Sequence, residues 1–153
     1  MLNKGFKEFT KLLNSRNVEY LAVGGYALAA HGHSRYTGDI AIWIGSSERS
    51  TSLVMDALRK FGFGDLEISA ADLSTPDSVV QLGYPPARID LLSSIDGVAF
   101  AACHANRLNV RIDDVDIPVI SERDFRANKL ASGRTKDLAD MQARDEGKKT
   151  TWP

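Results

Sequence analysis

Hydrophobic positions along the chain follow helical spacing in two stretches. Near the N-terminus, apolar residues recur at intervals of four, three and four and so share one stripe of a helix. That stripe consists of Leu2, Phe6, Phe9 and Leu13. Polar Asn14 to Asn17 then predict a turn. A second amphipathic pattern predicts a helix over residues 53–61, ended by Gly62.

Shorter apolar runs, each bounded by turn-forming residues, predict β-strands. The predicted strands are residues 18–23, 39–44, 78–82, 88–93, 108–112 and 115–120. The third and fourth are expected to form a hairpin across the glycine and prolines between them. Asp113 and Asp114 predict a tight turn between the last two strands.

Three further helices complete the expected architecture. The first spans 26–31 and stops at Gly32, and residues 65–77 allow no assignment. Ser121, with Asp124 three residues later, is a candidate N-cap for a C-terminal helical part over about 121–146, followed by a tail at 147–153. The last helix of this part is expected to begin at residue 135. This order of elements predicts an α+β fold, a mixed β-sheet with helices packed on it, in a single domain over 1–153.

Composition narrows the class of protein further. With 153 residues, 19 Lys+Arg against 20 Asp+Glu and a formal net charge of −1, the chain lacks the basic excess of proteins that coat nucleic acids. Its single cysteine excludes a disulfide framework. Apolar runs are too short to span a bilayer and the N-terminus shows no secretory signal, so we expect a cytoplasmic protein without membrane contact.

Most of the candidate functional residues lie within residues 21–44. The strand predicted there runs into Gly24 and Gly25, where the backbone can approach a phosphate and the following helix N-terminus offers N–H groups. Asp39 begins the next strand, and its side chain leaves the same face as that of Ala41. Asp90, on a later strand, is placed to add a carboxylate to that face.

These residues resemble the nucleotidyltransferase superfamily, which has the polymerase-β-like fold. The resemblance is closest to its small bacterial and toxin–antitoxin-associated members. The family pattern is Gly-Gly or Gly-Ser at a strand-to-helix turn, then Asp-x-Asp on a strand, then a third carboxylate on a later strand. Gly24-Gly25, Asp39 and the strand Arg88-Ile89-Asp90-Leu91-Leu92 match it. Residues 129–140 resemble the C-terminal helical part of uncharacterised bacterial members.

The resemblance implies transfer of a nucleoside monophosphate from an NTP to an acceptor hydroxyl. In the family, two Mg²⁺ ions clamp the attacking and leaving oxygens. Asp39 and Asp90 would ligate the metal, and Gly24 and Gly25 would cradle the triphosphate. RNA, a protein and a small molecule are all acceptors known in the family. A toxin–antitoxin setting would also imply a cognate partner protein.

Basic residues elsewhere could add phosphate contacts. Arg35 lies in the loop before Asp39, and Lys129 lies in the basic C-terminal part. A solvated loop and a solvated helix face are the structural alternatives for these two residues.

One position departs from the family pattern. Ala41 stands where the second Asp of Asp-x-Asp is expected, and a methyl group cannot ligate a metal. Transfer activity is therefore expected to be absent or severely impaired. Either Ala41 was introduced to inactivate an enzyme, which the otherwise intact pattern favours, or the chain is a naturally non-catalytic member. The functional alternative is a module that binds a nucleotide or a partner without chemistry.

Other interpretations of the same residues carry less weight. Gly24-Gly25 lacks the G-x-G-x-x-G spacing of a dinucleotide site. The histidines and Cys103 are not spaced as zinc ligands, and Cys103 is expected to be a packed small residue. Asp90, inside an apolar strand, needs a partner, so its structural alternative is an ion pair with Arg88 or Arg35.

Overall fold

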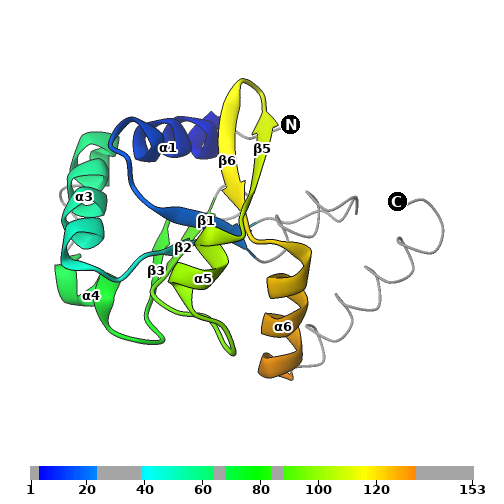
Figure 1. The fold of residues 1–153 in the computed structure, drawn as a ribbon. Helices are drawn as coiled ribbons and strands as arrows, with labels where there is room; N and C mark the ends of the chain where they lie inside the picture. Colours follow the sequence, from blue (N-terminus) through cyan, green and yellow to red (C-terminus); the bar gives the residue numbers. More distant parts are fainter. Residues whose placement is uncertain (1–3, 24–38, 64–67, 84–87, 134–153) are drawn as a thin grey trace.

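The computed structural model describes residues 4–23, 39–63, 68–83 and 88–133 (Figure 1). Its helices are α1 (Lys4–Ser15), α3 (Glu48–Leu58), α4 (Ala70–Ser74), α5 (Phe100–Ala105) and α6 (Glu122–Ser132), with a π-helical turn, η1 (Arg59–Phe63), after α3. Its strands are β1 (Tyr20–Val23), β2 (Asp39–Ile44), β3 (Val79–Leu82), β4 (Arg88–Leu92), β5 (Leu108–Ile112) and β6 (Val115–Val119). None of the helices in these ranges is long and apolar enough to cross a membrane.

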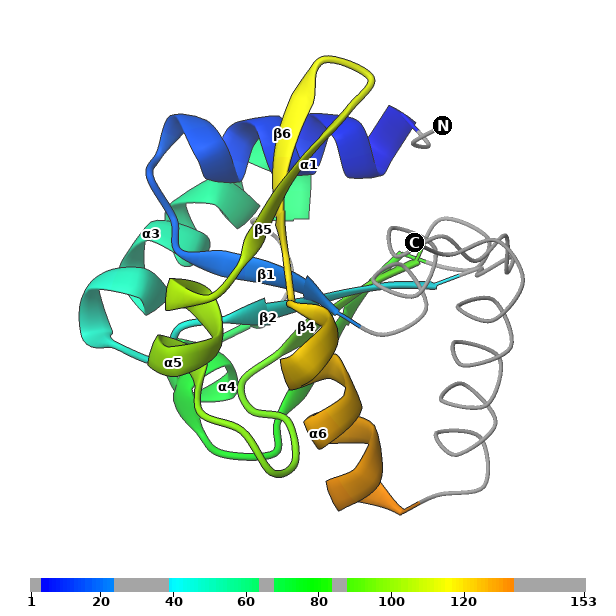
Figure 2. The same cartoon turned by 45° about the vertical axis from the view of Figure 1, so that its right-hand side comes forward.

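The six strands form one mixed sheet in the order β3-β4-β2-β1-β6-β5. β2 pairs parallel with β4, and β1 pairs parallel with β6, while the other three neighbouring pairs are antiparallel. The predicted α+β class is thus confirmed, as are the hairpin between β3 and β4 and the tight turn at Asp113 and Asp114. Both turn residues have positive φ, at 49° and 66°, as a two-residue hairpin turn with right-handed twist requires. Figure 2 shows this β5–β6 hairpin (yellow) projecting past α1, with α6 (orange) continuing from the end of β6.

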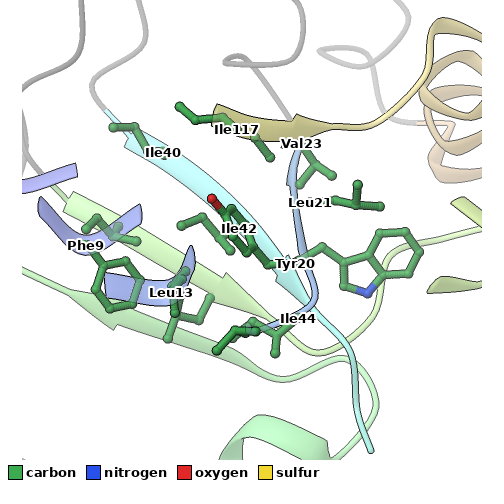
Figure 3. Packing of buried hydrophobic residues seen from close by; sticks show 14 of the residues in the cluster. Phe9, Leu13, Tyr20, Leu21, Val23, Ile40, Ile42, Ile44 and Ile117 are labelled. Atoms are coloured by element: carbon green, nitrogen blue, oxygen red, sulfur yellow. The ribbon is translucent and has the colours of Figure 1, made fainter. Parts of the chain in front are cut away.

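The two faces of β2 meet different helices because side chains alternate along a strand. On one face, Ile42 and Ile44 belong to a buried cluster that includes Phe9 and Leu13 of α1 (Figure 3). On the other face, Trp43 meets Phe100 of α5 edge to face, with ring centroids 5.2 Å apart. Ala41 lies on the same face as Trp43, and so does its register partner Asp90, so the candidate chemistry is on the α5 side of the sheet.

Several helices differ from the sequence-based expectation. α3 begins at Glu48, ahead of the predicted residue 53, because Ser47 caps it by accepting a hydrogen bond from the Ser50 N–H at 3.1 Å. α4, in the unassigned stretch 65–77, begins with a full capping box between Ser69 and Asp72. α5 was not expected, since six residues are too few to show a helical period. The helices predicted at 26–31 and from 135 lie outside the described residues.

Loop 93–99, between β4 and α5, is anchored to α6. Asn128 of α6 donates a hydrogen bond from Nδ2 to the carbonyl of Asp96 at 3.0 Å. The N-terminus of α6 is capped as predicted, with Ser121 Oγ accepting from the Asp124 N–H at 3.2 Å. The hydrogen bond from Asn128 ties α6 to the loop that follows β4, the strand that carries Asp90.

Candidate active site

The centre of the candidate site is the pairing of β2 with β4. The parallel register sets Asp39 opposite Arg88 and Ala41 opposite Asp90. Register partners in neighbouring strands send their side chains to the same face of the sheet. The methyl group of Ala41 is therefore the lateral neighbour of the Asp90 carboxylate. For Asp39, the structure fixes the backbone position in β2, and its side chain lies outside the described part.

Asp90 is engaged by a cation from its own strand. Arg88 and Asp90 are two residues apart on β4 and so share a face. Arg88 Nε lies 3.0 Å from Asp90 Oδ1, and Arg88 Nη2 donates a hydrogen bond to Asp90 Oδ2 at 3.3 Å. Only 25% of the Arg88 side chain and 15% of the Asp90 side chain are exposed. The ion pair with Arg88, the structural alternative for Asp90, is confirmed.

The two contacts between these side chains differ in kind. Asp90 Oδ1 is covered from solvent and accepts no hydrogen bond from the described residues, so the Nε contact at 3.0 Å is a charge contact with poor hydrogen-bond alignment. Oδ2 takes the directed hydrogen bond from Nη2. The guanidinium thus spans both carboxylate oxygens, as Arg–carboxylate pairs commonly do.

Of the residues predicted to bind the nucleotide, only Lys129 lies in the part of the chain that the structure describes. Gly24, Gly25 and Arg35 lie outside the described residues. The residue before Gly24, Val23, is the register partner of Ala41, so β1 ends directly beside the candidate site. Lys129 does not lie on a solvated helix face, because only 8% of it is exposed and its Nζ lies 5.4 Å from the centroid of the Phe125 ring.

Residues next to the site are packed for stability. Trp43 is buried between β2 and α5, where the Phe100 ring meets it edge to face and also stacks on His104, with centroids 5.3 Å apart. Burial lowers the pKa of His104, and the neighbouring Arg107 lowers it further. Cys103 is buried as expected, and burial together with the Asp124 carboxylate raises the pKa of its thiol to about 12.

A cavity of about 460 Å³ lies away from this constellation. Residues of α3 and α4 line it, among them Thr51, Met55 and Ser74, and none of the candidate site residues contributes. The cavity therefore adds nothing to the chemistry at Asp90.

The described side chains, which do not include that of Asp39, do not fit the two-metal site that the family resemblance implies. They contain no group of three or more His, Cys, Asp or Glu side chains that could hold a metal ion. A hard divalent cation prefers several oxygen ligands, whereas Asp90 has the methyl group of Ala41 beside it on β2 and the guanidinium of Arg88 next to it on its own strand. Among the described side chains, the arrangement offers one carboxylate, and Arg88 already compensates its charge.

Comparison with known proteins supports the assignment of the fold. No family model and no curated protein matches the chain. Among solved structures, the chain is similar to a protein of Thermotoga maritima described as a "putative nucleotidyltransferase", with 14% identity, 93% of each chain covered and a TM-score of 0.63. Identity this low speaks for the fold alone. The six-stranded mixed sheet with its helices is a nucleotidyltransferase-like fold.

Proposed function

We propose that this chain derives from enzymes that transfer a nucleoside monophosphate from an NTP to an acceptor hydroxyl, and that its own transfer activity is lost or crippled at position 41. The observation that carries the proposal is the register pairing of Ala41 with Asp90. The carboxylate pattern of such enzymes is otherwise kept at Asp39 and Asp90, but its middle member is a methyl group.

The physical reason lies in what phosphoryl transfer demands of a protein. Catalysis is almost entirely positioning and charge stabilisation, because there is little covalent chemistry for the protein to supply. Removing one group that holds the charge in place typically costs roughly 10²–10³ in rate. The loss at position 41 is expected to cost at least that much. The Thermotoga maritima protein supports the proposal at the level of the fold.

The test is to return the carboxylate. Purified wild type, Ala41→Asp and Ala41→Asn are assayed for pyrophosphate release from each NTP, with Mg²⁺ and with RNA, protein and small-molecule acceptors. Ala41→Asn is the matched control, since it has the shape of Asp without its charge. We expect Ala41→Asp to exceed wild type by roughly 10²-fold or more, with Ala41→Asn at background. Wild-type activity equal to that of Ala41→Asp would contradict the proposal.

A second candidate is a binding module that performs no chemistry, such as one member of a toxin–antitoxin pair. The Arg88–Asp90 ion pair favours it, because the carboxylate that would serve catalysis is already engaged within the protein. Calorimetry separates the two candidates. NTP binding that Asp39→Ala abolishes supports a retained nucleotide site, whereas tight binding of a partner protein without NTP binding supports the module.

A further inference from the structure

We infer that Arg88 is the resident counter-charge of Asp90, and that its guanidinium, in addition to the loss of a carboxylate at position 41, closes this site to divalent cations. The inference goes beyond the proposed function because it concerns which positive charge the folded site holds. It stands whether or not the protein transfers nucleotides.

The geometry of the pair is the first argument. Arg88 reaches both carboxylate oxygens of Asp90, and Oδ1, the oxygen facing Nε at 3.0 Å, is covered from solvent. A cation entering from solvent would have to displace the guanidinium to reach that oxygen. Because the pair is mostly covered, the incoming ion would also have to lose much of its hydration to reach the carboxylate.

The neighbours of Asp90 in the sheet give the second argument. Its register partners are Ala41 on β2 and Gln81 on β3, and neither carries a negative charge. Asp39 is in register with Arg88, so its backbone lies beside the guanidinium-bearing residue instead of beside Asp90. The side chain two residues before Asp90 on the same face is itself a cation. Among the described side chains, a divalent ion at Asp90 would meet one carboxylate and be repelled by Arg88 at short range.

Matched substitutions at position 88 test this with a metal alone as the probe. Mn²⁺ is titrated into the full chain, and free Mn²⁺ is read from its electron paramagnetic resonance signal. The proteins are wild type, Arg88→Lys, Arg88→Gln, Asp90→Asn and the double variant Arg88→Gln/Asp90→Asn. Lysine keeps the positive charge and glutamine removes it, while thermal melts show whether each variant is folded.

We expect wild type and Arg88→Lys to bind no more Mn²⁺ than Asp90→Asn does. This should hold up to about 1 mM Mn²⁺, the dissociation constant of the weakest protein sites for hard cations. Arg88→Gln should bind one Mn²⁺ ion at least about tenfold more tightly than wild type does, because the positive charge that repels the ion is gone. The double variant, which lacks the Asp90 carboxylate, should not bind that ion.

Two results would overturn the inference. One is Mn²⁺ uptake by wild type that Asp90→Asn abolishes. The other is a folded Arg88→Gln variant that binds no more Mn²⁺ than wild type. If Arg88→Gln does not fold, the comparison of wild type with Asp90→Asn still decides. The result of the Ala41→Asp activity assay is separate, so failure of either idea can be recognised on its own.

Discussion

Gly97 packs directly against Ala131: a Cβ atom added at Gly97 would stand 2.3 Å from the Cβ of Ala131. The loop after β4 therefore approaches α6 too closely for a side chain at position 97, and the hydrogen bond from Asn128 to the Asp96 carbonyl holds it there. Gly97 also has φ +79°, a conformation that side chains disfavour. The contact couples the strand bearing Asp90 to the helix bearing Lys129.

Gly97→Ala should destabilise the fold because it combines a steric clash with backbone strain. We expect a loss of about 2–4 kcal/mol in the free energy of unfolding, measured by urea denaturation. Gly133→Ala is the matched control, since Gly133 also has positive φ, +63°, but no atom lies within 4 Å of an added Cβ. It should cost only about 1 kcal/mol. Equal losses at the two positions would show that the clash with Ala131 has been relieved by movement.

Removing Arg88 should cost more than removing a comparable surface arginine. Arg88→Gln leaves Asp90 covered and uncompensated, and we expect about 1–3 kcal/mol, below the value for a fully buried pair because the side chains are partly exposed. Arg111 pairs with Asp116 at the same 3.0 Å, but these side chains are 62% and 68% exposed. Arg111→Gln should therefore change stability by less than about 1 kcal/mol in the same urea titration. A smaller loss for Arg88→Gln than for Arg111→Gln would contradict this ranking.

Cys103 should make the protein sensitive to alkali. Because burial and Asp124 raise the pKa of the folded thiol from 9.0 to about 12, the folded state keeps a proton that the unfolded state releases first. This contribution to stability is present below pH 9 and is lost as the pH rises from there toward 12. Urea denaturation at several alkaline pH values should show a shallower decline for Cys103→Ala than for wild type. Parallel declines would mean that other groups, such as buried Tyr20, account for the effect.

The same thiol should resist modification in the native protein. At pH 8 a disulfide reagent is expected to label Cys103 at least about 100-fold more slowly than in the urea-unfolded chain, since both burial and the raised pKa suppress the thiolate. Asp124→Asn removes the neighbouring charge but leaves the thiol buried. Labelling of that variant should remain slow, and rapid labelling would show that the carboxylate, not burial, protects the sulfur.

Asn14 joins three elements and should couple energetically to Tyr20. The Tyr20 hydroxyl donates to Asn14 Oδ1 at 3.0 Å, and Asn14 Nδ2 donates to the carbonyl of Asp116 on β6 at 2.8 Å. In a double-mutant cycle, Tyr20→Phe and Asn14→Ala should show a coupling of about 0.5–1.5 kcal/mol. If the two losses are fully additive, the hydrogen bond between Tyr20 and Asn14 contributes no net stability over hydrogen bonds to water.

Local patterns were sufficient for much of this fold. β2 was predicted with the bounds it has, because an apolar run rich in isoleucine follows Asp39 and ends before a glycine. The turn at Asp113 and Asp114 could also be predicted, since aspartate tolerates positive φ. The ion pair at Asp90 could be anticipated as an alternative because Arg88 shares its strand face.

Other features depend on contacts that no local pattern reports. α5 is short and has no side-chain cap, so its position rests on Phe100 and Cys103 packing into the core. The burial of Lys129 could not be predicted because a lysine in a polar helix is usually solvated, whereas here it is 8% exposed with its Nζ over the Phe125 ring. The register that sets Ala41 against Asp90, and not against a different residue of β4, follows from the pairing of whole strands.

The parallel pairing of β1 with β6, through Ala22 and Val119, has a consequence for how the chain is made. This contact joins the beginning of the sheet to its end in sequence, and such long-range pairings close large loops and slow folding. During synthesis β1 and β2 leave the ribosome well before β6, so β1 waits with one edge unpaired. A nascent chain stalled before Val115 should therefore remain protease-sensitive, and the sheet should become resistant only once β6 has emerged.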